Sequence, residues 1–320
     1  MIVVWRVTQR CNLACPFCEW DRSLPGERKD AAPEQVLRFA RVLADYQRDA
    51  KEPVLLSWLG GEPTLWPSLY ELAPQVKELG LAQSTTTNGT TLASPKVRAL
   101  ALRNFSELTV SVDGFADFHE RMRGWPGGFL RLQEGVKALA HQRAGRTALK
   151  LRVNVVLMRR NLASFADLCC ALADWGVDEI TFNALGGRDR PEFFSANGLR
   201  PQDTEALAAL LPRLRAQLAL AGVRLCGGDE YVARISASAR QERLAGSRCT
   251  PASNFLFIDE HGRVAPCDFT VGGYGTPVDE LSSVDELRAL PFRLAARRRD
   301  QRLAACNDCR STQVFSKFSS

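Results

Sequence analysis

Short apolar runs and amphipathic stretches alternate along the first 185 residues. The stretch 33–49 shows the amphipathic pattern, because Val36, Phe39, Ala40 and Leu43 recur at helical spacing. The apolar runs predict strands at 2–8, 54–59, 82–87, 107–112, 148–158 and 179–183. The amphipathic stretches between them predict helices at 33–49, 67–79, 94–102, 129–143 and 164–175.

This alternation of six strands with helices predicts a parallel sheet, because each helix returns the chain to the same end of the sheet. Six such units, where a closed TIM barrel has eight, are typical of an open barrel. The expected fold class is therefore α/β, with a partial (β/α)6 TIM barrel. In such a barrel, ligands bind at the carboxyl ends of the strands.

The pattern becomes shorter and less regular after residue 183. The expected elements are helices at 202–221 and 232–244, a hairpin of strands 255–258 and 263–266, and a basic helix near 294–303. The sequence therefore predicts three parts: a barrel over 1–200, a helical connector over 201–247 and a hairpin-plus-helix domain over 248–320.

The composition is that of a globular protein, since 45% of the 320 residues are hydrophobic and 24% are charged. No run approaches the length of a membrane span, so we expect no membrane partner. The apolar start before Arg6 is too short for a secretory signal, and a cytoplasmic location is expected. The net charge of +6 comes from arginines scattered through helical stretches, so no nucleic-acid partner is expected.

The ten cysteines add candidate chemistry. Without a secretory signal they are expected to stay reduced, and their clustered spacing indicates metal binding. Cys11, Cys15 and Cys18 follow the first predicted strand in a C-x3-C-x2-C pattern. Three thiolates cannot complete a tetrahedral zinc site, but they can hold three irons of a cubane cluster and leave the fourth iron open to a ligand.

This pattern, with the aromatic Phe17 before its last cysteine, resembles the signature of radical S-adenosylmethionine (radical SAM) enzymes. Further motifs lie where that family places them, at the ends of successive predicted strands. The resemblance implies that the Gly-Gly-Glu-Pro motif contacts the methionyl ammonium, that Ser111 contacts the ribose and that Arg123 pairs with the carboxylate. The implied S-adenosylmethionine contacts are Phe17, Gly60, Gly61, Glu62, Pro63, Asn88, Ser111, Arg123, Asn154 and Asn183.

A second group of cysteines lies near the end of the sequence: Cys249, Cys267, Cys306 and Cys309. From spacing alone, four thiolates with a hairpin between the first pair fit either a zinc site or a cubane cluster. The spacing also resembles the Twitch domain of SPASM-type radical SAM enzymes, which implies one auxiliary [4Fe–4S] cluster. No cysteine follows Cys309, so the chain departs from the longer SPASM pattern.

The resemblance implies that S-adenosylmethionine and two [4Fe–4S] clusters produce a 5′-deoxyadenosyl radical, with electrons from a reductant such as flavodoxin or ferredoxin. The radical would abstract hydrogen from a small-molecule substrate in the biosynthesis of a natural product or a cofactor. If the auxiliary cluster accepts an electron from the substrate, the outcome is a two-electron oxidation, and a base must take up a proton. The candidate bases are Arg188, Asp189, Asp229, Glu230 and Tyr231, in segments expected to cover the barrel mouth.

Among these we predict Asp189 and Glu230 as catalytic residues, with Cys226 as a donor of a hydrogen atom to a product radical. Core packing is the alternative role of Cys226, and it is the expected role of Cys169 and Cys170, whose side chains diverge on a predicted helix.

Two other functions stay open. A maturase of ribosomally made peptides would use the same chemistry, but the first predicted strand begins at residue 2, which leaves no room for the N-terminal recognition domain that many such enzymes carry. A separate recognition protein would remove that objection. A non-catalytic zinc-stabilised or electron-carrier protein is disfavoured by the intact cofactor motifs.

Overall fold

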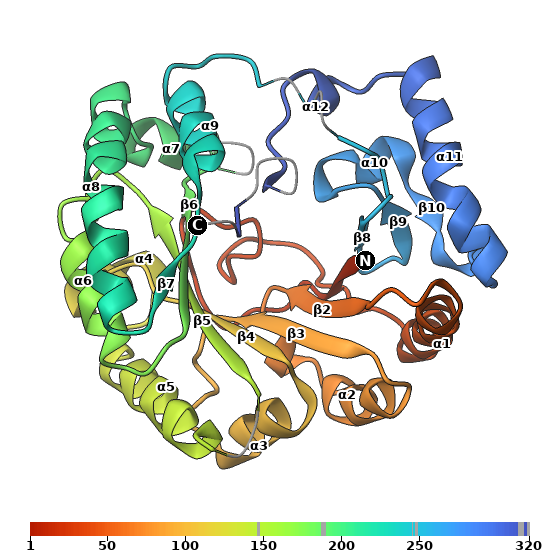
Figure 1. Ribbon diagram of the computed structural model, residues 1–320, viewed down its shortest axis with the longest axis horizontal. Coiled ribbons are helices and arrows are strands. Elements are labelled where there is room, and N and C mark those ends of the chain that lie inside the picture. Colours follow the sequence, from red (N-terminus) through yellow and green to blue (C-terminus); the bar gives the residue numbers. More distant parts are fainter. Residues whose placement is uncertain (146–147, 187–189, 245, 247–248, 313–316, 319–320) are drawn as a thin grey trace.

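The computed structural model describes residues 1–145, 148–186, 190–244, 246, 249–312 and 317–318. These residues form one curved sheet of ten strands in the order β10-β9-β8-β1-β2-β3-β4-β5-β6-β7 (Figure 1). The strands from β8 to β7 pair in parallel, whereas β9 and β10 continue the sheet in antiparallel pairing. The strands are β1 (Ile2–Thr8), β2 (Leu55–Gly60), β3 (Ala82–Thr87), β4 (Glu107–Ser111), β5 (Lys150–Leu157), β6 (Glu179–Ala184), β7 (Arg224–Leu225), β8 (Phe255–Ile258), β9 (Arg263–Ala265) and β10 (Thr276–Pro277).

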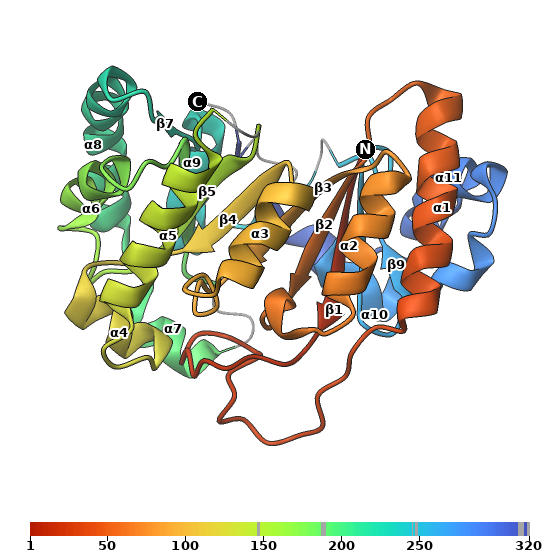
Figure 2. The same cartoon turned by 90° about the horizontal axis from the view of Figure 1, so that it is seen from below.

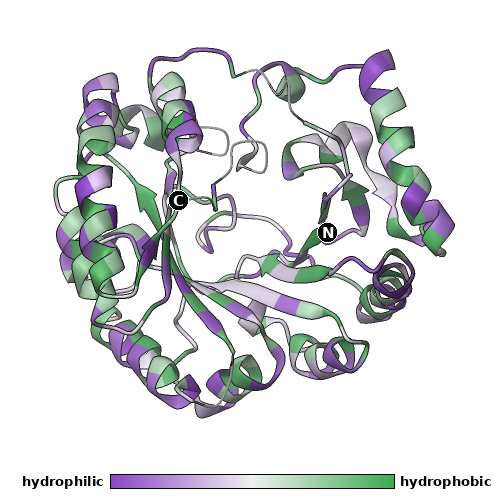
Figure 3. Ribbon diagram, viewed as in Figure 1, coloured by the Kyte–Doolittle hydropathy of each residue, from purple (hydrophilic) through white to green (hydrophobic). Residues whose placement is uncertain are grey.

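Helices cover the outer face of this sheet (Figure 1). They alternate hydrophobic and hydrophilic residues along their length (Figure 3). The α-helices are α1 (Pro33–Ala50), α2 (Leu69–Glu78), α3 (Pro95–Asn104), α4 (Ala116–Arg123), α5 (Phe129–Arg143), α6 (Phe165–Ala173), α7 (Pro191–Asn197), α8 (Pro201–Leu220), α9 (Asp229–Ala239), α10 (Val271–Tyr274), α11 (Val284–Asp300) and α12 (Ala304–Asn307). The short 3-10 helices are η1 (Pro63–Leu65), η2 (Asp268–Thr270) and η3 (Val278–Glu280).

Side chains alternate between the two faces of each barrel strand. In β5, Val153 and Val155 are fully buried in the main hydrophobic core under the helices. Arg152 and Asn154 alternate with them and so point to the barrel interior, because successive side chains of a strand face opposite sides. The apolar outer face holds the helices, and the polar inner face is available for binding.

A single sheet includes strands from all three parts that the sequence predicts, namely the barrel, the connector and the C-terminal domain. β7, from the expected connector, pairs in parallel with β6, and β8, from the expected C-terminal domain, pairs in parallel with β1. An open parallel sheet leaves unpaired backbone N–H and C=O groups at both edges. β7 and β8 form hydrogen bonds with these groups on β6 and β1.

Several helices differ from the sequence expectation. α4, α7, α10 and α12 fall in stretches where no helix was predicted, and α9 ends at Ala239, five residues before the predicted end. α11 begins at Val284, ten residues before the predicted basic helix. Its start is set by a capping box, in which Ser283 Oγ accepts from the Glu286 N–H and the Glu286 carboxylate accepts from the Ser283 N–H.

None of the helices in the described residues is both long and apolar enough to cross a membrane.

A charged network lies inside the barrel near the amino ends of the strands. Glu179 on β6 is bonded to Arg152 on β5 (2.6 Å) and to Arg224 on β7, and Arg152 is also bonded to Glu107 on β4 (3.0 Å). Burial raises the pKa of Glu179, but hydrogen bonds from Arg224 and Arg152 outweigh burial and hold that pKa below its usual value of 4.5. The ionised carboxylate therefore ties three strands together.

We expect Glu179→Gln to lower the free energy of unfolding by about 3 kcal/mol at pH 7, because the buried Arg152 would keep only the half-buried Glu107 as a carboxylate partner. A carboxyl whose pKa is lower in the folded chain stabilises the fold above its ordinary pKa and loses that contribution as the pH falls through the folded value. The difference between the two proteins should therefore shrink as the pH is lowered below 4.5. Urea unfolding across this range measures it.

The matched control is Glu78→Gln at the exposed end of α2, which should change the unfolding free energy by less than about 0.5 kcal/mol. A loss for Glu179→Gln that stays the same at every pH would contradict the assigned role of the ionised carboxylate.

Candidate functional site

The loop that carries the first cysteine group follows β1 and extends beyond the strand ends on the side opposite the N-terminus (Figure 2). The turn after β2 holds the start of this loop. The N–H of Gly61 donates to the carbonyl of Thr8 (2.8 Å), and the N–H of Glu62 donates to the carbonyl of Arg10 (2.8 Å). A Cβ at Gly61 would lie 2.4 Å from the Arg10 carbonyl oxygen, so only glycine allows this approach.

Glu62 is fully buried and joins the end of β2 to the end of β3. Its carboxylate accepts four hydrogen bonds, from the Thr64 N–H, the Thr64 hydroxyl, the Thr87 hydroxyl and the Asn88 N–H. Burial raises the pKa of Glu62, and these four donors oppose that rise. The side chain is thus occupied within the protein, which leaves the backbone carbonyls of the glycine turn as the acceptors for a bound ammonium.

The three thiols of the first group are largely buried and close enough to influence one another electrostatically. Burial raises the pKa of Cys15 to about 11 and that of Cys18 to about 12. N–H groups point at the sulfurs: that of Leu13 at Cys11 Sγ (3.5 Å) and that of Trp20 at Cys18 Sγ (3.4 Å). Such donors stabilise thiolates that ligate iron. The loop therefore fits a cluster, and binding iron would displace the thiol protons.

Arg123 lies at the end of α4, within electrostatic range of these thiols. Its Nε donates to Asp113 Oδ2 (2.7 Å), and its guanidinium lies 5.3 Å from the centroid of the Phe17 ring. Its side chain also hydrogen-bonds the Cys15 thiol, and this buried guanidinium is the predicted partner of the S-adenosylmethionine carboxylate. Sequence reasoning missed Asp113, which is fully buried and fixes this guanidinium.

The other predicted S-adenosylmethionine contacts lie along the strands of the barrel. Ser111 on β4 is in register with Asn154 on β5. The Asn154 Oδ1 accepts from the Thr181 hydroxyl (3.0 Å), from Asn183 Nδ2 (3.4 Å) and from the Lys317 ammonium (3.0 Å). Asn88 donates from Nδ2 toward Cys11 Sγ (3.6 Å). Lys317 was not predicted, because a lysine near the end of a chain normally indicates a solvated position.

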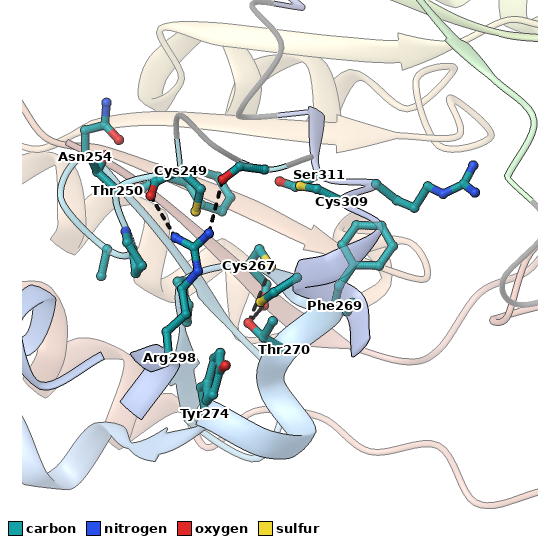
Figure 4. A pocket seen from close by; sticks show the side chains of 18 residues that line it. Cys249, Thr250, Asn254, Cys267, Phe269, Thr270, Tyr274, Arg298, Cys309 and Ser311 are labelled. Carbon is teal, nitrogen blue, oxygen red and sulfur yellow. Dashed lines mark hydrogen bonds between the residues drawn. The ribbon is translucent and has the colours of Figure 1, made fainter. Parts of the chain in front are cut away.

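The second group of cysteines surrounds one cavity of about 140 Å³, lined by Cys249, Cys267, Cys306 and Cys309. Figure 4 shows Arg298 beside it, and this side chain donates to the carbonyls of Cys249 (2.9 Å) and Gly246 (3.1 Å). Burial raises the pKa of Cys267 to about 12. Four thiols around a cavity fit a closed cubane cluster, whose ligands sit on four separate irons.

No three His, Cys, Asp or Glu side chains converge tightly enough to hold a single metal ion in the part of the chain that the structure describes.

The predicted catalytic residues and candidate bases lie in different parts of the chain, and two of them are not described. Asp189, with Arg188, lies outside the described residues. Glu230 is exposed on the first turn of α9, and the Asp229 side chain beside it is fully exposed. Tyr231 is buried, and its hydroxyl donates to the Phe182 carbonyl (2.9 Å) and to Asn183 Oδ1 (2.8 Å).

The three remaining cysteines are buried to different degrees. Cys169 is buried in the main core and Cys170 packs against it, as expected. Cys226 is fully buried outside that core, beside the Glu179 network, and burial raises the pKa of its thiol.

We expect Gly61→Ala to destabilise the chain by about 1–3 kcal/mol and to lower the iron retained after anaerobic reconstitution, because residue 10 must move and Cys11 follows it. Urea unfolding and iron analysis measure the two effects. Gly272→Ala is the control, since its added Cβ has no atom within 4 Å. Equal stability of the two variants would show that the close approach at Gly61 is dispensable.

Comparison with known proteins agrees with this geometry. Residues 5–147 match the family model described as "Radical SAM superfamily". An "AdoMet-dependent heme synthase" of Oleidesulfovibrio alaskensis is 25% identical over 283 residues, which cover 84% of this chain and 69% of that protein. An "Fe-coproporphyrin III synthase" of Methanosarcina barkeri is 34% identical over 186 residues, which cover 58% of this chain and 44% of that protein.

The fold is also found among solved structures. Streptococcus suis SuiB bound to its precursor peptide SuiA matches with a TM-score of 0.70 and 15% identity, over 99% of this chain and 70% of SuiB. At this identity the likeness concerns the fold alone, a radical SAM partial barrel followed by antiparallel hairpins. The matched region begins within β1 and contains the cysteine loop and Arg123, and the chain is accordingly a radical SAM enzyme, whose family uses S-adenosylmethionine and a [4Fe–4S] cluster.

Proposed function

We propose that this enzyme abstracts hydrogen from a small-molecule substrate and oxidises it by two electrons with the help of an auxiliary [4Fe–4S] cluster. The observation that carries the proposal is the cavity lined by all four cysteines of the second group. Four thiolate ligands leave no open iron, so this cluster would pass electrons and would not bind substrate.

A second cavity, here called the central cavity, supports the proposal. It has a volume of about 560 Å³ and reaches from Asn183 and Ala184 at the end of β6 to Phe269 and Arg310. Phe269 and Arg310 also line the cysteine cavity, so the two cavities share a wall. A substrate in the central cavity would lie beside the barrel mouth and beside the electron acceptor, as a coupled removal of hydrogen and an electron requires.

The residues of the first site would bind S-adenosylmethionine through its charged ends. The Arg123 Nη groups would take the carboxylate, while the carbonyls of Gly60 and Gly61 would accept from the ammonium. Ser111 and Asn154 would contact the nucleoside from neighbouring strands, with Asn88, Asn183 and Phe17 around it. When bound, S-adenosylmethionine and the two clusters supply a 5′-deoxyadenosyl radical and an electron acceptor.

A base must also take up the proton that the oxidised substrate releases. Asp189 remains a prediction, and the exposure of Glu230 gives it no support. Cys226 remains a candidate hydrogen donor, because its raised pKa keeps the thiol protonated.

Two of the relatives support a small molecule as substrate, since heme synthase and Fe-coproporphyrin III synthase are named for products of that kind. Peptide modification is the alternative outcome of product analysis. We further propose a flavodoxin or ferredoxin as reductant and a cytoplasmic location, because thiols and exposed clusters require a reducing compartment.

The roles of the two clusters can be tested separately, with one cysteine variant for each cluster. The unmodified chain should bind about eight irons and eight sulfides after anaerobic reconstitution, as two cubanes require. Cys11→Ala should retain about four irons and form no 5′-deoxyadenosine with dithionite, because the cluster that binds S-adenosylmethionine is lost. Iron analysis and chromatography of the nucleoside measure both. Bound zinc without sulfide in the unmodified chain would contradict the assignment.

Cys306→Ala should lose the other cluster and keep the formation of 5′-deoxyadenosine. We expect about four irons to remain, 5′-deoxyadenosine still to form, and net oxidation of the substrate to stop, because the electron acceptor is lost. Cys170→Ala on α6 is the matched control and should keep about eight irons. Normal amounts of oxidised product from Cys306→Ala would show that the second cysteine group does not conduct the electron.

A further inference from the structure

A groove on the surface of α11, here called the basic groove, lies beside the cavity of the second cysteine group. It has a volume of about 660 Å³, and its lining on α11 and just after it consists of Pro291, Phe292, Ala295, Arg298, Arg299 and Arg302. These positions recur at intervals of three or four residues and so follow one side of the helix. The buried residues of the same helix lie on a different side: Leu287, Leu290 and Leu294.

The basic groove carries a net positive charge. Three arginines line it, and the described residues of its lining include no Asp or Glu. The described partners of two of these arginines are uncharged: Arg298 donates to backbone carbonyls, and Arg302 donates to a backbone carbonyl (2.8 Å) and to Asn307 Oδ1 (2.7 Å). Arg299 is exposed and forms no hydrogen bond or ion pair within the described chain. Asp300, the one acidic residue in the second half of α11, offsets at most one of the three charges.

Phe292 adds an exposed aromatic ring to this face. Its exposed fraction is 78%, which is unusual for so large an apolar side chain. Aromatic residues and arginines are the residue types enriched where proteins bind one another. A second copy of this chain is a poor occupant, because two such faces would bring like charges together. A protein with an acidic surface would match both the charge and the apolar ring.

The basic groove and the cysteine cavity share a wall. Cys249, Thr250, Pro251 and Arg298 line both of them. Figure 4 shows Arg298 reaching to Cys249 at this wall, where it donates to the Cys249 carbonyl (2.9 Å). A protein seated in the groove would therefore contact residues around a predicted ligand of the second cluster. Electron transfer between two proteins requires such a close approach of their redox centres.

The proposed oxidation gives this approach a purpose, because it leaves one electron on the second cluster in every turnover. The 5′-deoxyadenosyl radical removes a hydrogen atom from the substrate. The substrate radical then loses a proton to a base and an electron to the cluster. That electron must pass to an external acceptor before the next turnover.

We propose that the basic groove is the docking site of an acidic electron-transfer protein, which takes this electron from the second cluster. Arg299 would attract the acidic surface of the partner, and Phe292 would pack against it. The proposal rests on the proposed function, because it requires a redox cluster at the second cysteine group.

The test uses Cys11→Ala, the variant expected to hold only the second cluster. It is reduced with dithionite, desalted and mixed anaerobically with an oxidised flavodoxin of net negative charge, and the absorbance of the flavin reports the electron transfer. In this background Arg299→Glu should lower the second-order rate about fivefold or more at low ionic strength, while Arg299→Lys should keep it. The difference should shrink in about 0.5 M sodium chloride, which screens the charges.

Two controls separate docking from other effects. Arg213→Glu makes the same charge change at an exposed position of α8, on the opposite side of the molecule from α11, and should keep the rate of the parent variant (Figure 1). Benzyl viologen, a small dication, should oxidise the cluster of Arg299→Glu no more slowly than that of the parent. Calorimetry of oxidised flavodoxin with the reconstituted chain that retains Cys11 measures docking without electron transfer, and Arg299→Glu should weaken this binding about fivefold or more.

Equal rates for Arg299→Glu and Arg213→Glu, or a parent rate that does not fall with salt, would overturn the proposal. A dimer of the chain that Arg299→Glu dissociates would assign this face to a second copy, and tighter binding of an RNA oligonucleotide than of flavodoxin would assign it to nucleic acid. Failure of the proposed function is recognised before flavodoxin is added, because Cys11→Ala would then lack its expected content of about four irons. That result would remove the electron donor and overturn both proposals.

Discussion

The pairing of β1 with a parallel strand on each side is the constraint on which the rest of this structure depends. β1 pairs with β2 from Ile2 to Thr8, with a shift of register between Arg6 and Thr8, and with β8 from Ile2 to Trp5. The first cysteine loop starts where β1 ends, and the hairpin that leads to Cys267 starts from β8. One strand therefore sets the position of both cysteine groups. Arg6 reinforces it, because its Nε donates to the buried Glu260 in the β8–β9 turn (2.5 Å) and its guanidinium lies 4.8 Å from the Trp20 ring in the loop.

Buried polar groups then hold the strand ends in a fixed frame. Glu62 joins β2 to β3 through four donors, and Asp113 joins Arg123 to the N–H of Val156 on β5 (2.9 Å). A buried polar group without a partner costs about 1–3 kcal/mol, so each such group fixes its neighbours in one arrangement. Most residues that the family resemblance assigns to the cofactor thus also stabilise the protein itself. These hydrogen bonds orient the donors and acceptors at the strand ends before any ligand binds.

The second cysteine group depends on contacts between distant segments. Its four thiols come from a loop, the end of a hairpin and the chain after α11. α11 is placed by side-chain contacts with α1, among them the ion pair between Arg288 and Asp49 (2.6 Å). Because the cavity between these segments shares Phe269 and Arg310 with the central cavity, the packing of these segments influences the shape of both cavities.

The sequence by itself determined the local features of this protein. Its periodicity located the six strands from β1 to β6 and the buried face of α1, and the C-x3-C-x2-C loop with Arg123 indicated the chemistry. Only the tertiary structure decided the partner of β8, the role of Asp113 beside Arg123, the exposure of Glu230 and the contact of Lys317 with Asn154. Periodicity reports which residues near one another in the chain share a buried face. The contact between Lys317 and Asn154 spans 163 positions, and it exists only because the sheet and its covering segments meet in space.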